Sequence, residues 1–171
     1  MRNSKRKLSL AFAALLLSLV AASALAQERP VILTGAELTR VVPTSYYFHG
    51  LAASTQMRNS AAARFGDKRY VIVGLVDTSG YSSEVRAKYE GFFITDSAIS
   101  INGSTLKTGA YGFGFSDNGK MHVLDLGGNE ILSVSTTKDA NLKRPRPLMM
   151  TQNGDGVRLY SGKDYVTITA K

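Results

Sequence analysis

The chain has 171 residues, a formal net charge of +8 and no cysteine. This length corresponds to one domain, and the absence of cysteine excludes disulfide bonds, thiol catalysis and thiolate metal sites. Four of the 21 basic residues stand in the first seven positions, so the other 17 exceed the 13 acidic residues by only four. A charge this small, without a basic and aromatic platform, argues against nucleic acid as a partner.

The N-terminal segment has the pattern of a secretory signal peptide. A basic start is followed by a small and apolar stretch over residues 8–22 and by an Ala-x-Ala site at 24–26. The stretch is short for a membrane span, which makes an uncleaved anchor the less favoured alternative. We therefore expect cleavage after residue 26, export to the periplasm or the medium, and a single β-rich domain over residues 27–171 without a later transmembrane segment.

In chain order, residues 27–43 are compatible with a strand and a turn or with a short helix. Residues 45–58 have a strand-like composition, and the three alanines at 61–63 suggest a helical turn. Residues 70–76, YVIVGLV, are apolar throughout and often β-branched, which is typical of a strand buried on both faces. We expect this last segment to be the central strand of a sheet.

One short helix is predicted near residues 83–90. Ser82 is a suitable N-cap, and Gly91 is a suitable stop. Helical spacing would place Val85 and Tyr89 on one face. We expect that face to contact the core.

From residue 91 onward, short β-rich runs alternate with turn residues. Turns that contain Asn-Gly or a similar pair indicate hairpins, because they need residues that accept a positive φ. Such turns occur at 102–103, 117–119, 127–129 and 153–156. The spacing predicts a mainly β fold, an antiparallel barrel or sandwich of about 8–10 short strands with one short helix.

The stretch 106–119, LKTGAYGFGFSDNG, contains strings that resemble enzyme motifs. Lys107-Thr108-Gly109 and Ser116-Asp117-Asn118 match strings of penicillin-recognising serine enzymes, but their order and spacing differ from that family. The glycines at 109, 112 and 114 precede a turn and a strand, whereas a phosphate loop needs a helix there. We interpret this stretch as a strand that leads into a hairpin turn.

Other polar candidates also have simpler interpretations. Asp77 lies in Asp-Thr-Ser, where an aspartic protease requires Asp-Thr/Ser-Gly, so a local turn is preferred. The two histidines, His49 and His122, lack the close spacing of a local metal motif. No catalytic set, metal site or cofactor is predicted. Asp77 or His49 would be the acid or base if the protein were a small hydrolase or isomerase.

The basic cluster near residue 143 contains two prolines that would keep it extended. Its three charged residues, Lys143, Arg144 and Arg146, are candidates for contact with an anionic surface. The alternative is a solvated loop that leads into the strand PLMM, and this alternative is preferred.

Aromatic residues form the most suggestive pattern of the chain. In a strand, Tyr111, Phe113 and Phe115 share one face, whereas the other face carries the nearly bare Gly112 and Gly114. Core packing is the first interpretation of this face. The functional interpretation is a ligand wall, to which other aromatics would contribute: Tyr46, Phe48, Phe92 and Tyr160.

Four stretches, LVDTSGYS, GAYGFGF, RPRPL and RLYSGKDYV, give the chain a resemblance to a group of exported bacterial β-rich proteins of unknown function. The likeness covers most of residues 43–169. It implies export and a β-rich fold, and it implies no activity and no site.

The favoured hypothesis is an exported, non-enzymatic binding or accessory module for a small apolar or aromatic ligand. The first alternative is the small hydrolase or isomerase that uses Asp77 or His49. The second is an envelope interaction domain that pairs with another protein through a strand edge.

Overall fold

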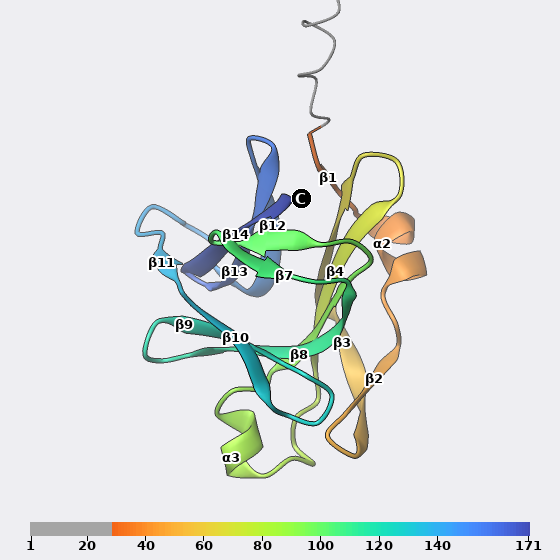
Figure 1. Cartoon of the computed structure of the whole chain (residues 1–171), viewed down its shortest axis with the longest axis vertical. Coiled ribbons are helices and arrows are strands. Elements are labelled where there is room, and N and C mark those ends of the chain that lie inside the picture. The colour runs from red at the N-terminus through yellow and green to blue at the C-terminus, as the bar shows by residue number, and fades with distance from the viewer. Residues whose placement is uncertain (1–28) are drawn as a thin grey trace, which may run out of the picture.

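The computed structural model describes residues 29–171, and the predicted signal peptide lies outside these described residues (Figure 1). Two antiparallel sheets form a sandwich, so the sandwich is the correct one of the two predicted β architectures. Each sheet ends in edge strands and neither closes on itself. Among the described residues, no helix is long and apolar enough to cross a membrane.

The larger sheet has eight strands, seven of which follow one another across the sheet. Their order is β1 (Val31–Ile32), β3 (Leu51–Phe65), β4 (Arg69–Val76), β5 (Gly91–Thr95), β8 (Gly109–Ser116), β9 (Lys120–Leu124) and β10 (Glu130–Ser135), and β2 (Ser45–Phe48) pairs with β3. β4, predicted as the central strand, is an internal strand between β3 and β5, but the middle strand of this order is β5.

The smaller sheet has six strands and contains the C-terminal part of the chain. Its order is β12 (Arg146–Asn153), β13 (Gly156–Gly162), β14 (Asp164–Ala170), β6 (Ile99–Ile101) and β7 (Ser104–Leu106), and β11 (Thr137–Lys138) pairs with β14. The described N-terminal end and the C-terminus lie at the same end of the molecule (Figure 1).

The two sheets enclose the main hydrophobic core. Inward-facing side chains of the larger sheet, such as Val73, Phe93 and Phe113, join Leu159 and Ile168 of the smaller sheet in one buried cluster. Strand alternation explains the arrangement, because every second residue of a strand points to the same face.

The opposite face of the larger sheet carries a second buried cluster, mostly aromatic. Phe48 stacks on Tyr89 with ring centroids 3.9 Å apart, and Phe92 and Tyr81 belong to the same cluster. Two short helices, α2 (Gly35–Val41) and α3 (Ser83–Arg86), contribute partly buried side chains that include Leu38 and Val85. The larger sheet is therefore covered on both faces.

Four sequence predictions need correction or completion. The described chain has 14 strands and two helices, where about 8–10 strands and one helix were expected. Ala61–Ala63 belong to β3 and are buried against the core, so the predicted helical turn is wrong. α3 begins at Ser83, with Ser82 accepting a hydrogen bond from Val85 N, but it ends at Arg86. The undecided segment 27–43 contains both a strand, β1, and a helix, α2.

Candidate functional sites

A mostly apolar pocket of about 390 Å³ lies where β12 packs against β3 and β1. Its charged lining side chains are Arg58 and Arg146, and no acidic residue lines it. The other lining residues are Ile32, Leu33, Thr34, Gly35, Leu38, Met57, Ser60, Ala61, Leu148, Met149 and Met150. We call this site the arginine pocket.

Both arginines come from segments in which the strand pairing is irregular. The register between β3 and β4 shifts between Thr55 and Ser60, and the register between β12 and β13 shifts between Arg146 and Met149. A register shift of this kind breaks the alternation of side chains and can redirect one of them. Within residues 29–171, neither guanidinium has an ion-pair partner.

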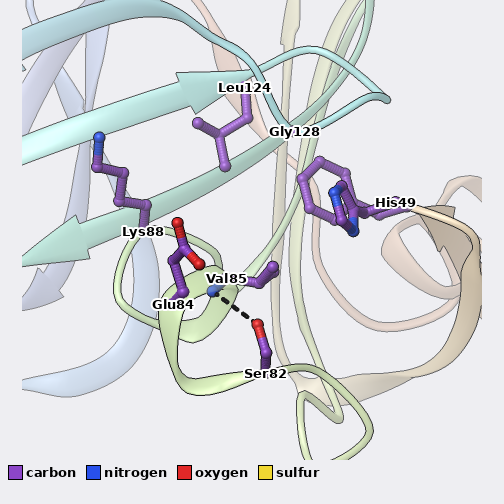
Figure 2. A pocket seen from close by; sticks show the side chains of 8 residues that line it. His49, Ser82, Glu84, Val85, Lys88, Leu124 and Gly128 are labelled. Carbon is purple, nitrogen blue, oxygen red and sulfur yellow. Dashed lines mark hydrogen bonds between the residues drawn. The ribbon is translucent and has the colours of Figure 1, made fainter.

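A second pocket, of about 320 Å³, lies beside α3 and the turn that follows β2 (Figure 2). Figure 2 shows His49 on one side of this α3 pocket and Lys88 with Glu84 on the other. Phe48, Val85 and Leu124 add apolar surface. The lining contains both a cation, Lys88, and an anion, Glu84. Its charge therefore does not favour anionic ligands over cationic ones.

Three polar side chains form a hydrogen-bonded array on the face of the larger sheet that α3 covers. Ser116 Oγ lies 2.7 Å from His122 Nε2, and His122 Nδ1 lies 2.7 Å from Glu130 Oε2. Lys88 Nζ donates a hydrogen bond of 3.1 Å to the same carboxylate oxygen. This Ser–His–Glu array contains a hydroxyl, a base and a carboxylate in the order that activates a serine nucleophile.

The register of the hairpin places Ser116 beside His122. Ser116 pairs with Lys120 and Gly114 pairs with His122, so Ser116 and His122 share one face of β8 and β9. Glu130 pairs with Leu124, whereas Leu132 pairs with Val123, which leaves one extra residue in β10. That extra residue turns Glu130 to the face of His122 instead of the inter-sheet core.

Burial and charge differ along the array. His122 is 5% exposed, Ser116 is half-buried, and 34% of the Glu130 side chain is exposed. Hydrogen bonds from Lys88 and then from His122 lower the pKa of Glu130. The carboxylate is therefore ionised at neutral pH and orients the imidazole through Nδ1.

The predicted aromatic wall is divided between the two faces of the larger sheet and the smaller sheet. Phe113 is buried in the inter-sheet core, where Tyr111 and Phe115 are partly buried. Tyr46, Phe48 and Phe92 belong to the second cluster, and Tyr160 is buried in the smaller sheet. Of the predicted wall residues, Phe48 lines the α3 pocket.

The face of β8 that looked bare in the sequence is covered by two different groups. A Cβ atom on Gly112 would collide with the ring of Phe48, and one on Gly114 would lie 2.5 Å from the Lys88 carbonyl oxygen. The two glycines therefore allow the second cluster and the segment after α3 to contact the strand closely.

The remaining predicted residues lie apart from one another. Asp77 is exposed, and its Oδ1 accepts a hydrogen bond of 3.0 Å from Ser79 N, as expected for a turn. His49 adopts a positive φ of 48° in the turn after β2. Lys143 and Arg144 are exposed ahead of β12, whereas Arg146 lies within β12 and lines the arginine pocket.

Sequence reasoning missed Arg58 and the Ser–His–Glu array. The turn at residues 117–119 was a usable signal, because hairpin pairing around it brings Ser116 and His122 to one face. Glu130 had no such signal, since its face depends on the extra residue in β10. Arg58 and Arg146 are 88 residues apart in the sequence, and the packing of β12 against β3 places both in the lining of one pocket.

Glu90, next to the array, makes the stability of the protein depend on pH. Its carboxylate accepts a hydrogen bond of 2.9 Å from Phe115 N, but burial raises its pKa. A raised pKa means that the folded state favours the protonated acid. The stability that protonated Glu90 contributes is therefore full below the unfolded pKa and is lost as the pH rises through the folded pKa. We expect Glu90→Gln to increase the free energy of unfolding at pH 7 and to lose that advantage near pH 4.

Urea unfolding of wild type and variant at the two pH values measures this difference, with the exposed Glu84→Gln as control. An equal loss of stability in Glu90→Gln at both pH values would show that the hydrogen bond outweighs the burial of charge.

A scan against models of known protein families finds no match for this chain, and searches of curated proteins and of solved structures find no significant match.

Proposed function

We propose that this domain is an exported binding protein for a small amphipathic carboxylate, which it holds in the arginine pocket. The observation that carries this proposal is that the charged lining consists of two arginines within an otherwise largely apolar pocket. Export is supported by the basic, apolar and Ala-x-Ala pattern of residues 1–26.

The pocket chemistry fits both ends of such a ligand. Met57, Met149 and Leu148 offer flexible and branched apolar surface for a hydrocarbon tail. Guanidinium groups bind carboxylates through paired, charge-assisted hydrogen bonds. A medium-chain fatty acid satisfies both requirements at once.

The strand-edge alternative has less support. β10 is an edge strand of the larger sheet, and its extra residue interrupts the regular pairing pattern. Bulges of this kind disfavour pairing with another chain. The alternative of a hydrolase that uses Asp77 or His49 has less support too, because Asp77 is held in a local turn.

Calorimetric titration of the protein with residues 1–26 removed tests the proposal, with decanoate as the probe and decyltrimethylammonium as a cationic probe of equal tail length. We expect decanoate to bind and the cationic probe to bind far more weakly. The variant Arg58→Gln/Arg146→Gln should weaken decanoate binding by about tenfold or more, because it removes charge-assisted hydrogen bonds.

The matched control is Lys143→Gln/Arg144→Gln, which removes the same charge from exposed residues outside the pocket lining. We expect this control to bind decanoate within about twofold of wild type. Equal affinity for both probes, or equal losses in the two variants, would contradict the proposed site.

A further inference from the structure

We propose that Ser116 is a nucleophile that accepts acyl groups from activated esters, with His122 as its general base and Glu130 as the residue that positions the imidazole. This activity is separate from the arginine pocket, whose lining contains none of the three residues. The geometry of the array carries the proposal, since both hydrogen bonds measure 2.7 Å.

The geometry is compatible with proton transfer from Ser116 to His122. A neutral imidazole that donates Nδ1–H to Glu130 has an unprotonated Nε2, which faces the Ser116 hydroxyl. The hydroxyl has two other acceptors, Asn118 Oδ1 at 2.6 Å and the Lys120 carbonyl oxygen at 3.3 Å. When the hydroxyl turns from Asn118 to His122, its proton points at the base that removes it.

Exposure along the array also suits a nucleophile. The base is buried, whereas the serine is half-buried and therefore remains partly accessible to a substrate. Once the proton has moved, the Glu130 carboxylate stabilises the imidazolium through its hydrogen bond to Nδ1.

Lys88 fixes the far end of the array. Its side chain lines the α3 pocket (Figure 2), and its Nζ hydrogen-bonds Glu130 of β10. The backbone carbonyl of Lys88 lies against Gly114, which is the cross-strand partner of His122. The carboxylate is thus held from two sides, by Lys88 and by the imidazole, which is the support that a positioned base requires.

The reaction consumes an ester and water. Ser116 Oγ bonds to the acyl carbon while its proton passes to His122 Nε2, and the bond from that carbon to the alkoxy oxygen breaks. The alcohol leaves with the proton held by His122. Water then attacks the acyl-serine in the same way, releases the carboxylic acid and restores the Ser116 hydroxyl.

Labelling with a fluorophosphonate tests the assignment directly, because Oγ displaces fluoride and forms a stable bond to phosphorus. Intact mass and peptide mapping should show one label, on Ser116, and none in Ser116→Ala. The control is Ser133→Ala, because Ser133 pairs in register with His122 without hydrogen-bonding to its ring. Labelling of another residue, or loss of labelling in the control, overturns the proposal.

Because replacing the buried His122 can destabilise the fold, a second variant tests the base while keeping this residue. The chain has no cysteine, so Ser116→Cys introduces a unique thiol. We expect iodoacetamide to alkylate this thiol at neutral pH about tenfold faster than that of Ser133→Cys, since a neighbouring imidazole promotes thiolate formation. Equal alkylation rates in the two folded variants would show that His122 does not activate position 116.

Discussion

Replacement of Phe48 by alanine is expected to lower the free energy of unfolding by about 3–5 kcal/mol, the usual cost of truncating a fully buried phenylalanine. The Phe48 side chain is completely buried, stacks on Tyr89 and lies against Gly112 of β8. Its removal leaves a cavity between β2 and β8. Urea denaturation followed by circular dichroism measures the loss.

The neighbouring Tyr47 is a matched control for this variant. It lies on the same strand but faces outward, with 60% of its surface exposed. We expect Tyr47→Ala to change stability by about 0.5 kcal/mol or less. Similar effects of the two substitutions would contradict the placement of Phe48 as the centre of the second cluster.

A second large effect is expected for Gly114→Ala, which should destabilise the protein by about 1–3 kcal/mol through overpacking. The new Cβ would lie 2.5 Å from the Lys88 carbonyl oxygen and 3.2 Å from Glu90 N. Both contacts are to backbone atoms, which cannot rotate away as a side chain does. The segment after α3 must therefore move away from β8.

Gly127→Ala is the control for this substitution. At that position a Cβ would approach only the side-chain ends of Asp125 and Asn129, at 3.2 and 3.3 Å. We expect its effect on the urea midpoint to be small. Wild-type stability of Gly114→Ala would show that the segment after α3 does not contact β8 as described.

Several elements of the fold were predictable because their signals are local. The apolar run at residues 70–76 is an internal strand, as its β-branched composition indicated. Ser82 caps α3, and the Asn-Gly and Asp-Asn-Gly turns join antiparallel strands, because capping and positive φ depend on residues next to each other in the chain.

Other elements depended on contacts between distant parts of the chain. Ala61–Ala63 favour a helix in isolation but form part of β3, because pairing with β4 and burial against the core outweigh a small local preference. In the sequence, Phe113 and Phe48 look equivalent, because both are aromatic residues within predicted strands. They nevertheless lie on opposite faces of the larger sheet, which the pattern of either strand alone does not specify.

The candidate sites show the same division. The sequence alone determined a β-rich domain in which short strands alternate with turns, and it excluded cysteine chemistry. It also indicated that residues 116 and 122 lie on either side of a hairpin turn. Tertiary structure decided that Glu130 reaches His122 and that Arg58 and Arg146 line one pocket. The physical reason is that irregular register and sheet-on-sheet packing set these positions, and both arise from the pairing of strands far apart in the chain.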